Sequence, residues 1–346
     1  MKDGLTTAAL QEARRVAAAT YQVCRLDGAL LPLGDEMHLT AWRGYAAEAG
    51  AQGVFPVLCE RLPQFWFPVR PGIAATDDYR AALYRGAPRD SLADAPGLKL
   101  VYPDELRLVI HTGPAGAVPV LLPRGREDFL TLFFALSCRH EPRHVPDSVG
   151  AAMIIGFNNW DRIRSYRRTW EDSAPPDAYW SDEFRRLTAR KECYQDRLLL
   201  VSDGPYSAVP AESMGLSEAE WRQASIQLRT VHECAHMLTY RLLKPDGKSL
   251  LDEFIADILA IVAVGGRFRP QWLLQFWGLD SPAGGLAGSR LAYYAPQADE
   301  AEQRRLAEWI VGLARDVETL FEMYGTGWPV QLAVVNALLG PSADSA

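Results

Sequence analysis

Residues 232–236 read His-Glu-Cys-Ala-His, which places two histidines four positions apart with a glutamate directly after the first. On an α-helix, side chains at i and i+4 lie on one face about 6 Å apart, so His232 and His236 can share one metal ion. Glu233 is rotated by about 100° around the helix and can act on a water molecule at that ion. Imidazole pairs of this kind are typical ligands of Zn²⁺, and the motif therefore predicts a zinc site with Glu233 as its general base.

The sequence around this motif predicts a long helix. Ser217 and Glu220 have the spacing of a capping box, which marks a helix start. Apolar residues then recur at alternating intervals of three and four from Trp221 to Leu242, and Pro245 ends the pattern. We expect one helix of about seven turns that holds both histidines beside its apolar stripe.

A second helix is predicted between Ser249, with Asp252 as its capping-box partner, and the Gly265-Gly266 pair. It is apolar except for Asp252, Glu253 and Asp257, so it should be buried. Two buried carboxylates at i and i+4 repel each other unless cations compensate them. We therefore expect Glu253 to be the third zinc ligand and Asp257 to orient a ligand histidine, with Asp252 as the alternative for that second role. The short connection at 244–248 predicts an antiparallel pair of helices.

This pattern, His232-Glu233-x-x-His236 followed by Glu253-x-x-x-Asp257, resembles the gluzincin type of zinc metallopeptidase. The resemblance implies that His232, His236 and Glu253 bind zinc, that Glu233 is the general base and acid, and that Asp257 orients a ligand. It covers about 50 residues of the chain. Asp252 stands where the family usually has an asparagine.

A second match to the same motif occurs at residues 140–144, His-Glu-Pro-Arg-His. Pro142 and Pro146 prevent a helix from running through this segment, so its histidines cannot stack one turn apart. We expect it to be a loop with no metal.

Further candidates are less constrained by spacing. The oxyanion formed during hydrolysis needs a donor, and the candidates are Tyr293, Tyr294, Arg290, Tyr240 and Arg229. We take Tyr293 and Tyr294 as possible catalytic groups, and Arg290 and Tyr240 as possible substrate contacts. Asn158 and Asn159 are a further possible substrate contact, although such a run more often forms a turn. Cys234 and the aromatic residues Trp272, Phe276 and Trp277 are expected in the core.

Composition excludes several classes of protein. The chain has 346 residues, is 48% hydrophobic and carries a formal net charge of -7, so we expect no nucleic-acid partner. The stretch from Met1 to Ala17 contains charged residues and no apolar segment typical of a signal peptide, and no stretch suits a membrane span. Five cysteines without a C-x-x-C pair argue against a disulfide framework. We expect a cytoplasmic protein, whose oligomeric state the sequence leaves open.

The remaining pattern predicts an α+β fold, mainly helical, in which a zincin-like catalytic helix pair lies beside a small mixed or antiparallel sheet. Strands are expected at 98–112, 117–122, 151–157 and 198–202, helices at 5–25, 36–50, 299–324 and 330–339, and either element at 129–138. We divide the chain into an N-terminal helical and β region of unknown role, 1–140, and a zincin-like catalytic region, 141–346, with the alternative that both belong to one domain.

The function expected from these features is a zinc-dependent hydrolase, most simply a metallopeptidase or amidase acting on a peptide or a small amide-like substrate, with Glu233 activating a zinc-bound water. The alternative keeps the zinc and the zincin-like fold in a small-molecule tailoring enzyme of a biosynthetic pathway. A third hypothesis is a non-catalytic binding module stabilised by zinc, but a purely structural zinc site does not need the Glu233 carboxylate.

Overall fold

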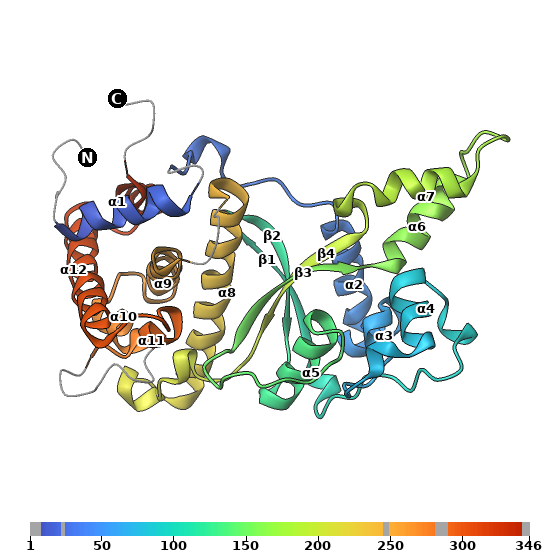
Figure 1. The fold of residues 1–346 in the computed structure, drawn as a ribbon, viewed down its shortest axis with the longest axis horizontal. Coiled ribbons are helices and arrows are strands. Elements are labelled where there is room, and N and C mark those ends of the chain that lie inside the picture. Colours follow the sequence, from blue (N-terminus) through green and yellow to red (C-terminus); the bar gives the residue numbers. More distant parts are fainter. Residues whose placement is uncertain (1–7, 22–24, 245–248, 281–289, 341–346) are drawn as a thin grey trace. The chain divides into compact units, whose positions relative to one another are not determined.

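The computed structural model describes residues 8–21, 25–244, 249–280 and 290–340 (Figure 1). It is mainly helical and contains one mixed sheet of four strands, which confirms the expected α+β class. The chain forms two compact units. We call Gly34–Gly204 the sheet unit, and Met1–Leu33 together with Pro205–Ala346 the helical unit.

This division differs from the expected boundary at residue 140. Strand β2 (Gly116–Leu122) pairs with β4 (Gln195–Val201), so segments from both sides of residue 140 share one sheet. Helix α1 (Ala8–Thr20) packs instead against α12 (Glu300–Tyr324) and α13 (Trp328–Leu339), near the other end of the chain. Pairing and packing between distant segments, which local composition does not mark, decide the division.

The sheet unit contains the four strands and several short helices. In chain order its elements are α2 (Leu39–Gln52), α3 (Val54–Arg61), α4 (Asp77–Arg85), β1 (Arg107–Gly113), β2, α5 (Gly125–Ser137), β3 (Ala151–Asn158), α6 (Trp160–Glu171), α7 (Trp180–Thr188) and β4. The spatial order is β1-β2-β4-β3, with β2 and β4 parallel and the outer pairs antiparallel. Strand β2 is buried along its whole length, as its continuous apolar sequence requires.

Two expectations for this unit change. The strand expected at 98–112 begins only at Arg107, because the Asp128 carboxylate accepts hydrogen bonds from the backbone N–H groups of Val101 and Tyr102 and so replaces a strand partner there. The ambiguous segment at 129–138 belongs to helix α5. Strands at 116–122, 151–158 and 195–201 lie where the apolar alternation predicts them.

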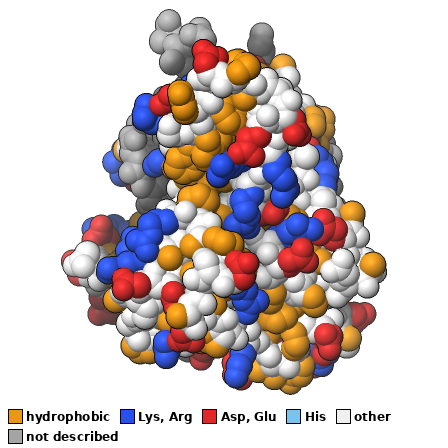
Figure 2. Space-filling view, turned by 90° about the vertical axis from the view of Figure 1, so that its right-hand side faces the viewer, with side chains coloured by type: hydrophobic (Ala, Val, Ile, Leu, Met, Phe, Trp, Pro, Cys, Tyr) orange, Lys and Arg blue, Asp and Glu red, His pale blue; other side chains and the backbone are white. Residues whose placement is uncertain are grey.

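Charges of both signs cover one face of the molecule. Figure 2 shows Lys and Arg side chains mainly across the middle of that face, with Asp and Glu side chains directly beside them. Many arginines of the sheet unit are paired in this way, among them Arg61 with Glu48 and Arg167 with Glu171. On the described part of this face, side chains of opposite charge therefore lie close enough to form ion pairs.

The helical unit holds the predicted motif. Its helices are α1, α8 (Glu218–Leu243), α9 (Leu250–Gly265), α10 (Pro270–Trp277), α11 (Arg290–Tyr294), α12 and α13. The helices expected at 5–25 and 299–324 correspond to α1 and α12, although α1 ends at Thr20, earlier than expected, and residues 5–7 lie outside the described part of the chain. Among the helices that the structure describes, none combines the length and the apolar character needed to cross a bilayer.

The second motif match, at residues 140–144, lies in a loop that follows α5. His140 has a φ of 63°, which no helix would allow, and its side chain is fully buried. The Gln64 carbonyl can only accept, so His140 Nε2 donates to it at 2.8 Å, and Nδ1 accepts from the Tyr79 hydroxyl at 3.2 Å. Both ring nitrogens are therefore used in packing this loop, whereas His144 is exposed.

Burial lowers the pKa of His140 to about 4, against about 6.5 in the unfolded chain. Between these values the unfolded chain binds a proton that the folded chain does not, so stability falls as the pH falls. We expect this residue to remove up to about 3 kcal/mol from the free energy of unfolding as the pH drops from 6.5 to 4.

Urea unfolding of wild type and His140→Gln across this pH range measures the effect, because only the wild-type curve contains the imidazole term. The control His144→Gln changes an exposed histidine of the same loop and should follow wild type. Equal pH slopes for wild type and His140→Gln would contradict the assignment.

Candidate metal centre

Helix α8 carries both histidines of the first motif and starts as predicted. The Ser217 hydroxyl accepts from the Glu220 backbone N–H, and Glu220 accepts from the Ser217 backbone N–H at 2.9 Å, which completes the capping box. The helix runs unbroken for 26 residues and buries Trp221, Leu228 and Leu238. Cys234 is buried in the core as expected, and burial raises the pKa of its thiol to about 12.

Helix α9 begins after Ser249, whose hydroxyl accepts from the Leu251 backbone N–H at 3.1 Å, and ends at a left-handed Gly266. The predicted capping box with Asp252 does not form, because that carboxylate binds a histidine of α8 instead. Nearly every residue from Leu251 to Val262 is buried, as the apolar sequence requires.

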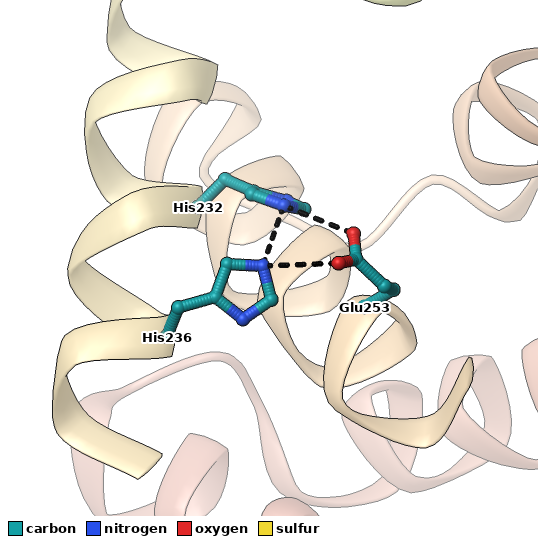
Figure 3. A group of neighbouring side chains, drawn as sticks. All are labelled: His232, His236 and Glu253. Atoms are coloured by element: carbon teal, nitrogen blue, oxygen red, sulfur yellow. Dashed lines mark hydrogen bonds and ion pairs between the residues drawn. The ribbon is translucent and has the colours of Figure 1, made fainter. Parts of the chain in front are cut away.

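The two helices pack closely, but they are not the expected antiparallel pair. Figure 1 shows α8 from the side and α9 almost end-on, so the helices cross steeply. The crossing brings the first turns of α9, with their acidic residues, against the face of α8 that carries the histidines (Figure 3). The connection between the helices, 245–248, lies outside the described residues.

His232, His236 and Glu253 point toward one another from the two helices (Figure 3). The Nε2 atoms of the histidines are 2.9 Å apart, and Glu253 oxygens lie 3.3 Å from His232 Nε2 and 3.5 Å from His236 Nε2. One ligand atom from each residue falls within a group no wider than 4.8 Å. The three side chains that the sequence predicted as ligands are therefore together.

Carboxylates fix the orientation of both imidazoles. His232 Nδ1 lies 2.8 Å from Asp257 Oδ1, and His236 Nδ1 lies 2.7 Å from Asp252 Oδ2. An ionised carboxylate only accepts, so each Nδ1 carries a proton and each ring directs its Nε2 atom at the other ring and at Glu253; in the neutral form of the ring this atom is a lone-pair donor. The two acids that the sequence offered as alternatives therefore each hold a different histidine.

Asp257 is saturated as a hydrogen-bond acceptor. Oδ1 accepts from His232 and from the Tyr206 hydroxyl at 2.6 Å, while Oδ2 accepts from Trp277 Nε1 at 2.8 Å and from Arg290 Nη1 at 2.9 Å. Four donors use the lone pairs of a carboxylate, and Asp257 is completely buried. This carboxylate can orient a ligand but has no oxygen left to bind an ion.

The net charge of the centre depends on the protonation of its two histidines. Among the described residues, Arg290 is the one guanidinium ion-paired with these three acids, through Glu253 and Asp257, so two negative charges remain on Asp252, Glu253 and Asp257 when both imidazoles are neutral. Burial alone would lower the pKa of His232, but the hydrogen bond and charge of Asp257 outweigh it and raise that pKa. Burial alone would raise the pKa of Glu253, but the hydrogen bonds and charges of His232 and His236 outweigh burial and lower that pKa below its usual range. Two protons or one divalent cation would balance this group.

The geometry suits a tetrahedral metal ion. Ligand atoms about 2.0–2.1 Å from such an ion lie about 3.3–3.4 Å apart, close to the 3.3 and 3.5 Å found here between Glu253 and the histidines. The 2.9 Å separation of the Nε2 atoms is somewhat shorter. With two nitrogens and one carboxylate as ligands, a tetrahedral ion would keep a fourth position for solvent or substrate.

Glu233 follows His232 on α8 and is half-buried. Among the residues that the structure describes, it makes no hydrogen bond and no ion pair, in contrast to the three acids of α9. Its carboxylate is thus available for a substrate or a water molecule, as its predicted role requires.

The structure brings some of the other predicted residues to this group. Arg290 binds Glu253 and Asp257, and its guanidinium lies over the Tyr294 ring. Burial and the neighbouring Glu253 raise the pKa of Tyr294. Both residues belong to the short helix α11.

Other candidates are placed differently. Tyr293 contacts the Tyr294 ring but is 57% exposed, and Tyr240, one turn beyond His236, is half exposed. Asn158 and Asn159 belong to the sheet unit. The Asn159 side chain accepts from the backbone N–H groups of Asp161 and Arg162, which is the turn-forming use of such a run.

Three contacts of the centre were not predicted. The Tyr206 hydroxyl lies 3.0 Å from His232 Nδ1 as well as on Asp257, and Trp277, expected only in the core, donates to Asp257. The Tyr21 hydroxyl donates to Asp252 at 3.2 Å. Tyr206 precedes Ser207 and Ala208, two non-glycine residues with positive φ, so a strained turn holds it in place. No spacing in the sequence connects these residues with the motif.

A model of a family of unknown function, DUF7005, matches residues 4–340, and the chain belongs to that family. No curated protein and no solved structure matches the chain. Because the family has no assigned function, the chemistry has to be inferred from the arrangement of these side chains.

Tyr206 provides a test of whether the hydrogen bonds around the histidines preorganise this centre. We expect Tyr206→Phe to weaken Zn²⁺ binding by about tenfold, because removing a group that orients a ligand typically costs 10–100-fold in affinity. Competition with a chromophoric chelator measures the change. Tyr324→Phe removes the hydroxyl of an exposed tyrosine of the same unit and should bind as wild type does. Unchanged affinity in Tyr206→Phe would show that the hydroxyl orients nothing.

Proposed function

We propose that this member of the DUF7005 family is a zinc-dependent hydrolase of gluzincin type that cleaves amide bonds. One observation carries the proposal. Two imidazoles whose Nδ1 atoms are held by carboxylates direct their Nε2 lone pairs at each other and at the Glu253 carboxylate. With both rings neutral, this convergence of electron pairs is repulsive, and either protons on the rings or a divalent cation between them would relieve the repulsion.

The donor set favours zinc among divalent cations. Imidazole nitrogens suit Zn²⁺, whereas Mg²⁺ and Ca²⁺ prefer oxygen ligands. A bound zinc ion would supply Lewis-acid chemistry by lowering the pKa of water and polarising a substrate carbonyl. His232, His236 and Glu253 would hold it, while Asp257 and Asp252 fix the rings.

Glu233 and Tyr294 then supply the proton chemistry. Glu233 accepts the proton of the attacking water and delivers it to the leaving amine, which is the work of a general base and acid. The Tyr294 hydroxyl stays protonated because burial raises its pKa, so it can donate to the oxyanion that forms at the carbonyl. Tyr294 is favoured over Tyr293 because it lies against Arg290 beside Glu253, while Tyr293 is exposed.

The substrate is the open part of the proposal. A peptide and a small amide-like metabolite require the same water activation, and the small-molecule tailoring enzyme remains the alternative function. Turnover of a mixed peptide library, compared with a panel of small amides and esters, would separate these substrate classes. Cleavage confined to the small molecules would favour the alternative.

The metal content of the purified chain tests the site directly. We expect about one zinc ion per chain in wild type, and strong loss of that ion in His232→Ala and Glu253→Ala, because each removes one of three ligands. Mass spectrometry with metal standards measures the stoichiometry. Glu318→Ala, a substitution of a different glutamate on α12, is the control and should keep the ion. Wild type that stays free of metal after incubation with Zn²⁺ would refute the proposal.

Glu233 separates catalysis from metal binding. We expect Glu233→Gln to keep its zinc while the hydrolysis rate falls by at least about 100-fold, since a general base contributes roughly 10²–10⁴-fold. The rate is measured on whichever substrate the library identifies, with the zinc content determined on the same preparation. If the variant keeps both zinc and the full rate, Glu233 is not the base.

A further inference from the structure

An arginine beside a site for a divalent cation is unexpected, because like charges repel. Arg290 nevertheless donates a hydrogen bond to Glu253, from Nη2 to Oε2 at 2.7 Å. Its side chain is only 16% exposed, and its guanidinium lies over the rings of Trp277 and Tyr294, 5.3 and 5.5 Å from their centres. The Arg290 side chain is thus held by contacts with Glu253, Trp277 and Tyr294.

The second arm of the guanidinium reaches the other acid. Nη1 donates to Asp257 Oδ2 at 2.9 Å, so one planar group bridges the carboxylates of Glu253 and Asp257. These acids occupy successive turns of α9, where they would repel each other in the buried interior. From the sequence we expected a histidine and a metal ion to compensate the negative charges of Glu253 and Asp257. The structure adds the Arg290 guanidinium, which is positively charged and lies between the two carboxylates.

The bridge links a ligand to the residue that orients another ligand. Glu253 faces both Nε2 atoms, and Asp257 holds His232 by its Nδ1. A rigid fork with two N–H groups fixes the distance and the plane of two carboxylates, which a single ammonium group does less well.

We propose that Arg290 is a positioning residue of the metal centre, which sets Glu253 relative to His232 by bridging Glu253 and Asp257. This inference rests on the proposed function, because it assumes that the three ligands bind an ion. It assigns Arg290, which the sequence suggested as a substrate contact, to the support of the ligands.

Two variants distinguish positioning from simple charge. Arg290→Lys keeps the positive charge but loses the planar fork and its stacking on Trp277 and Tyr294. Arg290→Gln loses the charge as well. If Arg290 positions the ligands, both variants should bind Zn²⁺ and Co²⁺ about 10–100-fold more weakly than wild type. If it acted only through its charge, Arg290→Lys would bind as wild type does and Arg290→Gln would bind more tightly, and either result overturns the proposal.

A spectroscopic readout makes the test independent of activity. With saturating Co²⁺, the visible absorption bands of Arg290→Lys should differ in position or intensity from those of wild type, because the geometry of the ligands has changed. An identical spectrum would overturn the proposal. Arg304→Lys and Arg304→Gln change an arginine of an exposed ion pair on α12 and should match wild type in both measurements.

The outcomes keep the two proposals apart. If wild type binds neither Zn²⁺ nor Co²⁺, the metal site itself fails. If wild type binds and the Arg290 variants are unchanged, only the positioning role fails. Circular dichroism of the metal-free proteins checks folding, and should Arg290→Gln not fold, Arg290→Lys carries the test alone, because it retains the charge between the two acids.

Discussion

The candidate centre depends on two hydrogen bonds between carboxylates and imidazoles, Asp257 to His232 and Asp252 to His236. Each bond holds the proton of its ring on Nδ1, and each therefore turns the other nitrogen inward as a lone-pair donor. Without them the rings could rotate or exchange their protons between nitrogens, and the Nε2 atoms would have no reason to converge on Glu253. The convergence of the three side chains, which could hold a metal ion, is thus a consequence of these two bonds.

These two hydrogen bonds require ionised carboxylates in or near the buried interior, which disfavours charge. Asp257 is fully buried and Glu253 nearly so, and burial by itself raises the free energy of an ionised carboxylate. Hydrogen bonds from neighbouring side chains offset this cost. Tyr206 and Trp277 donate to Asp257, and Arg290 donates to both acids. Because removal of any one partner would leave a buried charge less compensated, the layer behind the ligands is as constrained as the ligands themselves.

The residues that hydrogen-bond to the acids of α9 come from distant parts of the helical unit. Apart from the histidines, the donors come from four separate parts of the chain: Tyr21 just after α1, Tyr206 before α8, Trp277 on α10 and Arg290 on α11. The strained turn at Ser207 and Ala208 and the stacking of Arg290 on Trp277 each direct a side chain toward α9. A site held from so many segments needs an ordered helical unit, and the sheet unit contributes none of the contacts described for it.

The sequence by itself determined the two helices, their caps at Ser217 and Ser249, and the identity of the residues that converge. These features are local: the i to i+4 spacing places His232 with His236 and Glu253 with Asp257, whatever the rest of the fold does. Only the tertiary structure decided the crossing of α8 and α9, the division of the chain into its two units, the separate tasks of Asp252 and Asp257, and the contacts of Tyr21, Tyr206 and Arg290. Those depend on packing between segments as many as 323 residues apart, and no periodicity along a single chain encodes such a distance.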